Sequence, residues 1–152
     1  MREARHSRNI TMNKPRTRPS PGNHDYHTSG ASGYFNYFGA NHAPDTSTGP
    51  LVQALYDNNA EVIATGHNHQ YERFAPMNPS GQLDNARGIR HFVAGMGGAS
   101  HYSFGTILPN SQARNSDTYG VLKFTLHANS YDWQFVPEAG KTYSDSGTTT
   151  CH

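Results

Sequence analysis

At 152 residues, the chain is long enough to enclose one hydrophobic core but not two, so we assign a single domain. Aromatic residues make up 11% of it, which excludes a disordered chain, because disordered chains lack the side chains that bury most surface. No apolar run has the length of a membrane span or of a signal peptide, so we expect no membrane partner and see no export signal in this chain.

The net charge of +1 conceals a basic segment at the start of the chain. Residues 1–20 carry six basic side chains and one acidic one, a net charge of +5. A basic arm of this kind can bind phosphates or nucleic acid. Because the segment lacks apolar periodicity and contains Pro15 and Pro19, it reads more simply as a disordered tail than as a nucleic-acid-binding arm.

The middle of the chain predicts a loop, a short helix and a strand. Residues 21–49 are rich in Gly, Ser and Asn and are mostly loop, with an aromatic run at 34–38 that could form one edge of the core. Residues 50–59 carry an apolar stripe behind an initial proline, which is typical of a helix. Residues 61–65 are β-branched and apolar, so we expect a buried strand there.

The second half of the chain predicts three further strands. A polar loop containing Pro76, Pro79 and Gly81 precedes a strand at residues 89–95, and a long irregular loop then extends to about Thr118. Residues 119–127 and 131–136 both alternate apolar and polar side chains, which predicts a β-hairpin with its turn near Asn129. The last nine residues, SDSGTTTCH, read as a polar tail.

Two short stretches carry candidate ligands: Gly22-Asn23-His24-Asp25 and Gly66-His67-Asn68-His69, the second at the end of a predicted strand. Residues beyond the carboxyl end of a strand face the crevice where ligands bind, and an extended segment points alternate side chains the same way, so the pair aims two imidazoles at one place. A His-x-His pair alone is more often two exposed loop histidines. An added Asn oxygen and a further imidazole suit first-row cations, whereas a Cys-rich zinc site is excluded because the chain has one cysteine.

These stretches resemble the GNH[DE] and GHxH motifs of calcineurin-like metallophosphoesterases. The runs GHNHQYERFAPM, RGIRHFVAGMGG and DWQFVP sharpen the resemblance toward the secreted bacterial branch that is similar to purple acid phosphatases, and the resemblance covers residues 21–152. It implies an α/β fold in which helices flank two packed β-sheets. This chain would supply mainly the second half of that fold, so the β-sandwich would be incomplete at its N-terminal side.

The resemblance also implies a function. Members of this family hydrolyse phosphoric esters, and we expect a phosphomonoester substrate rather than a diester. In the implied mechanism a metal-bound hydroxide attacks phosphorus in line while two bridged ions of Fe, Zn or Mn polarise the ester. It further implies that Asn23 and His67 ligate one ion and that His69 ligates the other, with His42 as a third histidine ligand.

Two further residues receive catalytic roles from the resemblance. His24 would contact the phosphoryl oxygens or assist the leaving group, since an imidazole can donate a proton near neutral pH. Asp25 would orient His24 through the second ring nitrogen. The resemblance places such proteins outside the cell or in the periplasm.

The upstream carboxylates of the family, in Asp-x-His and Gly-Asp motifs, have no counterpart in residues 1–20. Without them the second ion would keep only His69, and no anion would offset the repulsion between two cations. The sequence therefore leaves open a shortened, catalytically impaired remnant that binds one metal ion or phosphate without turnover. Uncovered sheet edges would then favour self-association.

Several remaining residues have simpler interpretations. We expect His91 to be packed within its strand and His101 to lie in a loop that could face the crevice. We expect Arg73 and Glu72 to form a surface ion pair. Cys151 is either a free exposed thiol or one half of a bridge to another molecule.

Overall fold

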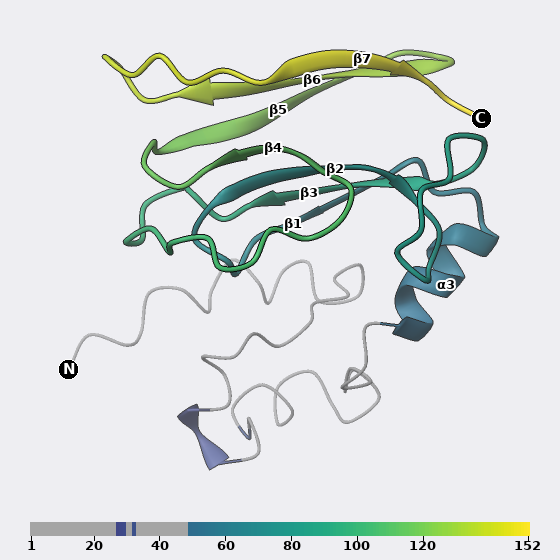
Figure 1. Cartoon of the computed structure of the whole chain (residues 1–152), viewed down its shortest axis with the longest axis horizontal. Coiled ribbons are helices and arrows are strands. Elements are labelled where there is room, and N and C mark those ends of the chain that lie inside the picture. Colours follow the sequence, from purple (N-terminus) through teal and green to yellow (C-terminus); the bar gives the residue numbers. More distant parts are fainter. Residues whose placement is uncertain (1–26, 30–31, 33–48) are drawn as a thin grey trace, which may run out of the picture. The chain divides into compact units, whose positions relative to one another are not determined.

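The computed structural model describes residues 27–29, 32 and 49–152. The chain divides into two compact units, residues 1–48 and residues 49–152, and the helix and strands described below belong to the second (Figure 1). The expectations for the basic arm, for the aromatic run at 34–38 and for the stretch at 22–25 concern residues outside the described ones. Within the described part, no helix is long and apolar enough to cross a bilayer.

A mixed four-stranded sheet follows a short helix, α3 (Gly49–Asp57). Its strands lie in the order β1-β3-β2-β4. β1 runs parallel to β3, whereas β2 is antiparallel to both of its neighbours. The strands are β1 (Val62–Thr65), β2 (Tyr71–Met77), β3 (Ile89–Ala94) and β4 (Ser111–Asn115).

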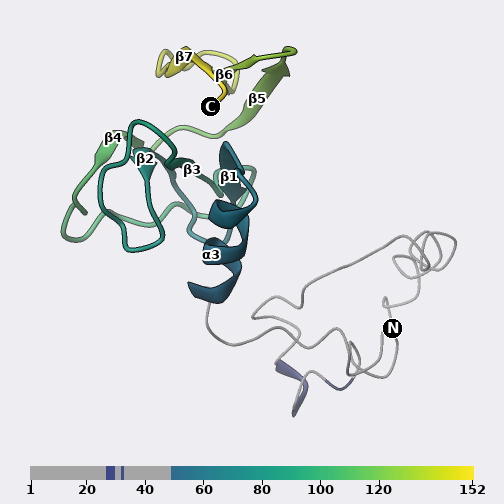
Figure 2. The same ribbon diagram turned by 90° about the vertical axis from the view of Figure 1, so that its right-hand side faces the viewer.

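The second sheet is antiparallel and has three strands in the order β5-β6-β7. They are β5 (Gly120–Leu126), β6 (Ser130–Pro137) and β7 (Ser146–Thr150). Figures 1 and 2 show this sheet stacked on the first one, with α3 to one side. Side chains on the facing surfaces of the two sheets therefore form the core.

Aromatic side chains from both sheets fill this core. The rings of Phe92 and Trp133 lie 5.7 Å apart, and those of Tyr71 and Phe135 lie 5.0 Å apart, so each pair joins one sheet to the other. Tyr131, Trp133 and Phe135, which alternate along β6, are buried, as expected for a strand with one face in the core. Because large aromatic side chains bury the most area, these contacts hold the two sheets together.

Three of the predicted elements are confirmed. The helix expected at 50–59 is α3, and the strand expected at 89–95 is β3. The predicted hairpin is formed by β5 and β6, with a hydrogen bond from the His127 amide to the Ser130 carbonyl of 2.9 Å closing its turn.

The strand expected at 61–65 exists as β1, but the expectation that it is buried was wrong. Val62 and Ile63 are half-buried, and Ala64 and Thr65 are exposed. Within the described sheet β1 pairs with β3 alone and therefore lies at an edge. An apolar, β-branched composition does not distinguish an edge strand from a central one.

Three strands were missed in segments read as loop or tail. β2 is a central, largely buried strand, although it contains Pro76. The register of its pairing with β3 shifts between Arg73 and Pro76, and this irregularity accommodates a residue that has no amide hydrogen. β4 and β7 consist mostly of small or polar residues. Each lies at the edge of its sheet, and its side chains are alternately exposed and half-buried, so neither strand needs an apolar face.

Candidate functional site

The candidate histidines lie in a tight turn between β1 and β2, residues 66–70, which we call the histidine turn. The Asn68 amide donates to the Gly66 carbonyl over 3.0 Å, and the Gln70 amide donates to the Asn68 carbonyl over 2.8 Å. His67 has a positive φ of 72°. The segment is therefore bent, and our premise that an extended backbone points both imidazoles the same way was wrong.

Strand topology and one glycine fix the position of this turn. The chain must cross the end of β3 to pass from β1 to β2, because β3 lies between them. Gly95 directly follows β3, and its amide donates to the Gln70 carbonyl over 3.1 Å. A Cβ on Gly95 would lie 1.9 Å from the Asn68 carbonyl oxygen. The backbone of the turn thus packs against a position that only glycine can occupy.

His69 is held by a loop that is distant in sequence. Its Nδ1 lies 2.8 Å from the Ser100 carbonyl oxygen. Since a carbonyl oxygen only accepts hydrogen bonds, Nδ1 carries the proton and Nε2 of the neutral ring has a free lone pair. The ring also stacks on Tyr102, with centroids 4.1 Å apart and planes 18° apart.

His67 differs from His69 in having no anchored side chain. The imidazole is exposed, and among the described residues it has no hydrogen-bond or ion-pair partner. Its left-handed backbone conformation costs roughly 1 to 3 kcal/mol for a residue other than glycine. Such strain is typical of positions where the side chain has a function.

His91 is packed, as the sequence predicted. It is half-buried, and its Nε2 lies 2.8 Å from the Thr65 hydroxyl oxygen. Burial lowers the pKa of His91, against the opposing effect of the Glu72 carboxylate. The ring is therefore neutral at physiological pH and joins β3 to the end of β1.

Arg73 lies in an ion pair between the two sheets, so the prediction of a surface pair with Glu72 was wrong. Its Nε donates to Asp145 over 2.7 Å, with the two side chains only 13% and 12% exposed. Tyr71 donates to the same carboxylate over 2.6 Å. Glu72 instead accepts a hydrogen bond from Ser111, because adjacent residues of a strand point to opposite faces.

A groove of about 360 Å³ lies on the second sheet, away from the histidine turn. Its lining includes Lys123, Asp132 and Thr148. The Asp132 carboxylate already accepts hydrogen bonds from Thr148 and His127, over 2.7 Å and 2.8 Å. The groove contains neither His67 nor His69, so we do not assign the predicted chemistry to it.

The remaining predicted site residues lie outside the described part of the chain: Asn23, His24, Asp25 and His42. Within the described part, no group of three or more His, Cys, Asp or Glu side chains is arranged to hold a metal ion. The structure therefore describes two of the predicted ligands, His67 and His69, and leaves their convergence with the others a prediction.

Sequence reasoning missed the residues that support His69. Ser100 acts through its backbone carbonyl, and Tyr102 lies 33 positions from the histidine, so neither leaves a local pattern in the sequence. Gly95 did carry a signal, since a glycine at the end of a strand often marks a close approach of two backbones.

Comparison with known proteins bears on this arrangement. Neither a protein-family model nor a curated protein matches the chain. A solved structure does match, that of a purple acid phosphatase isolated from yellow lupin (Lupinus luteus) seeds, with 25% sequence identity and a TM-score of 0.57 over 78% of this chain. The fold is metallophosphoesterase-like.

This likeness confirms the α/β, two-sheet architecture that the motifs predicted. The chain spans about a fifth of the lupin protein, because the match covers 22% of that protein's length. Activity, metals and substrate belong to the proposal that follows.

Proposed function

We propose that this protein is a metal-dependent phosphoric ester hydrolase, acting on monoesters rather than diesters, with His67 and His69 as metal ligands. The observation that carries the proposal is the hydrogen bond of 2.8 Å between His69 Nδ1 and the Ser100 carbonyl oxygen. Metal-binding histidines almost always donate their second ring nitrogen to such an acceptor, which fixes the tautomer and frees the other nitrogen. The likeness to a purple acid phosphatase supports the same chemistry.

The two histidines fit a first-row metal ion by their donor chemistry. His67 is exposed and His69 is half-buried, so burial does not close either ring off from a cation. Imidazole nitrogens suit Fe and Zn, two of the three ions that the resemblance implies. A bound cation would polarise the ester and acidify the attacking water.

The other predicted residues complete the proposed site. Asn23 and His42 would add an amide oxygen and an imidazole to the ligands at 67 and 69. His24 would contact the phosphoryl oxygens or protonate the leaving group, oriented by Asp25. The resemblance that supports these roles also favours a bacterial, secreted phosphatase, extracellular or periplasmic, that acts on a phosphate ester.

Substitution of the two ligands tests the proposal. We expect the full chain to release p-nitrophenol from p-nitrophenyl phosphate when supplied with Zn²⁺, Mn²⁺ or Fe³⁺, and His67→Ala and His69→Ala each to lower the rate by more than about 100-fold. Loss of a residue that merely supports a ligand lowers metal affinity or activity by 10- to 100-fold, so loss of a ligand itself should lower the activity further. The His67 side chain is exposed, so the folded structure should tolerate its removal, and circular dichroism should show that the variant of the half-buried His69 is also folded.

His127→Ala is a matched control. His127 is also an exposed histidine, but it pairs with Asp132 on the second sheet over 2.8 Å. Its removal should leave the rate of hydrolysis within about 2-fold of the starting value, because an exposed ion pair contributes little to the stability of the fold. Metal-stimulated hydrolysis that survives His67→Ala and His69→Ala unchanged would refute the assignment.

The second candidate is a remnant that binds one metal ion or phosphate without turnover. It is favoured by the small number of ligands in the described part of the chain, where His67 and His69 have no carboxylate cluster beside them. Zn²⁺ uptake of about one equivalent per chain by calorimetry, with no hydrolysis of p-nitrophenyl phosphate, would establish it. Uptake of about two equivalents with hydrolysis would establish the enzyme instead.

A further inference from the structure

Residues 100–102, which we call the clamp segment, contact the histidine turn at three points. The Ser100 carbonyl oxygen lies 2.8 Å from His69 Nδ1. The Tyr102 amide donates to the His69 carbonyl over 3.1 Å. The Tyr102 ring stacks on the imidazole. The clamp segment thus contacts both the backbone and the side chain of His69.

The three contacts restrain different degrees of freedom. The Ser100 carbonyl accepts only, so it selects the tautomer of His69 with hydrogen on Nδ1. The stacked Tyr102 ring, nearly parallel at 18°, restrains the plane of the imidazole. The hydrogen bond from the Tyr102 amide fixes the backbone from which the imidazole projects. Together the three contacts fix the direction in which Nε2 and its free lone pair point.

The clamp segment is itself anchored through its middle residue. The His101 ring packs against Tyr119 at a tilt of 31°, with ring centroids 4.1 Å apart, and its Nε2 is buried. Tyr119 directly precedes β5, and the Gly120 amide donates to the Met96 carbonyl over 3.3 Å. His101 therefore ties the loop to the second sheet, while Tyr102 contacts His69.

We propose that Tyr102 is a positioning residue for His69, and that the clamp segment holds this histidine as the Nδ1–H tautomer with Nε2 presented to a cation. The role as a metal ligand rests on the function proposed above, whereas the tautomer and its dependence on Tyr102 do not. Tyr102 is itself half-exposed, which fits a side chain that supports a site at the surface.

Imidazole ¹⁵N spectra of the metal-free full chain test the clamp. At about pH 8, where histidines are neutral, His69 should show a protonated Nδ1 and a bare Nε2, with its signals identified by their loss in His69→Gln. Tyr102→Phe retains the stacked ring and should leave the spectrum unchanged. Tyr102→Ala should convert His69 to a mixture of tautomers, because without the stacked ring the imidazole can turn away from the Ser100 carbonyl.

Leu108→Ala is the matched control, because Leu108 lies in the same loop and is 60% exposed. It should leave the His69 signals as they are, and circular dichroism should show that each variant is folded. A protonated Nε2 in the unaltered chain, or a single Nδ1–H tautomer that persists in Tyr102→Ala, would overturn the proposal.

Zn²⁺ calorimetry separates the clamp from the proposed function. Tyr102→Ala should weaken Zn²⁺ binding about 10-fold or more, the cost of losing a residue that orients a ligand, whereas Tyr102→Phe should remain within about 2-fold. If the unaltered chain takes up no Zn²⁺, the proposed function fails and the spectra still decide the clamp. If Zn²⁺ binds equally well to Tyr102→Ala, the clamp fails and the proposed function stands.

Discussion

His67 adopts a backbone conformation that residues with a side chain rarely adopt. Its φ of 72° lies in the left-handed region, where a Cβ approaches the following carbonyl oxygen. Nothing among the described residues compensates by bonding to the imidazole, which is exposed. The strain is therefore retained at a position where glycine would be the more stable residue, and it is consistent with a side chain kept for its chemistry.

Two substitutions at this position separate strain from chemistry. Both His67→Gly and His67→Ala remove the imidazole, but only glycine adopts a positive φ without cost. We expect His67→Gly to be more stable than His67→Ala by about 1 kcal/mol in urea unfolding, whereas glycine is ordinarily the less stable of the two. The usual order, with alanine more stable, would mean that His67 is not strained in solution.

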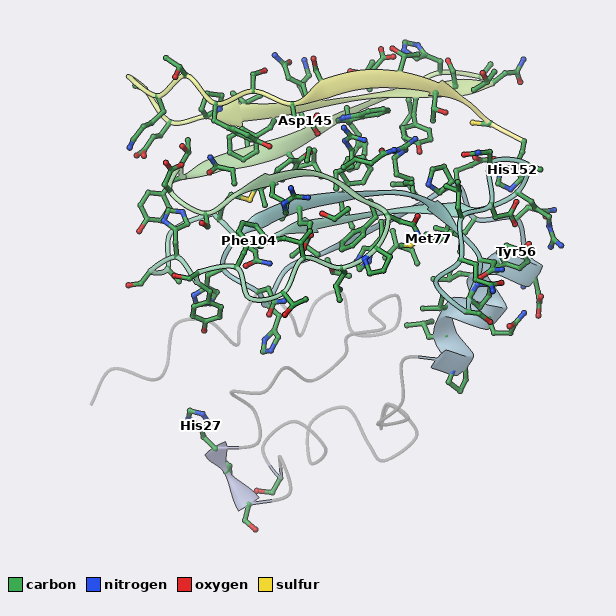
Figure 3. The ribbon with its side chains drawn as sticks, in the orientation of Figure 1. His27, Tyr56, Met77, Phe104, Asp145 and His152 are labelled. Carbon is green, nitrogen blue, oxygen red and sulfur yellow. The ribbon has the colours of Figure 1, made fainter. Side chains whose placement is uncertain are left out.

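At the scale of elements, Asp145 links the two sheets. It directly precedes β7, lies between the sheets (Figure 3), and accepts hydrogen bonds from Arg73 and Tyr71 of β2. Burial alone raises the pKa of Asp145, but the hydrogen bonds from Arg73 and Tyr71, together with the positive charge of Arg73 and a hydrogen bond from Trp133, hold the pKa below its usual value. The ionised carboxylate thus stabilises the fold above the usual aspartate pKa of about 3.9, and this contribution is lost as the pH falls through the lower folded value.

We expect Asp145→Asn to lower the free energy of unfolding by about 3 kcal/mol at pH 7, because it leaves the Arg73 charge largely buried and unpaired. The difference between the two proteins should shrink below about pH 4, where the carboxylate of the unaltered chain becomes protonated. Urea titrations at several pH values measure this. Asp132→Asn is the control, because the side chains of Asp132 and its partner His127 are 41% and 47% exposed. This substitution should lower the free energy of unfolding by less than about 1 kcal/mol. Equal losses in both variants would show that the Asp145 link contributes no more than a surface pair.

At the scale of the whole molecule, the strength of the sequence signals determined how much could be predicted. The hairpin of β5 and β6, α3 and β3 have clear apolar periodicity and were predicted. β2 was missed because Pro76 suggested a loop, and β7 because a polar edge strand resembles a tail. The two-sheet fold was predicted from motif resemblance rather than from periodicity. His67 and His69 were found by their spacing, whereas Ser100 and Tyr102 are brought to them only by folding.

The aromatic core that joins the two sheets should make residues 49–152 unfold as one unit. Trp133 is the only tryptophan of the chain and packs against Phe92 of the first sheet, so its fluorescence reports on the interface. We expect the urea transition of this fluorescence to coincide with that of far-ultraviolet circular dichroism, as in a two-state domain. A fluorescence change at clearly lower urea would show that the sheets separate before they unfold.

The absence of a side chain at Gly95 has a consequence for how this chain can vary. Because the Asn68 carbonyl oxygen occupies the place of a Cβ there, the spacing between the end of β3 and the histidine turn is set by backbone against backbone. A single methyl group at this one position would push the turn outward and carry both imidazoles with it.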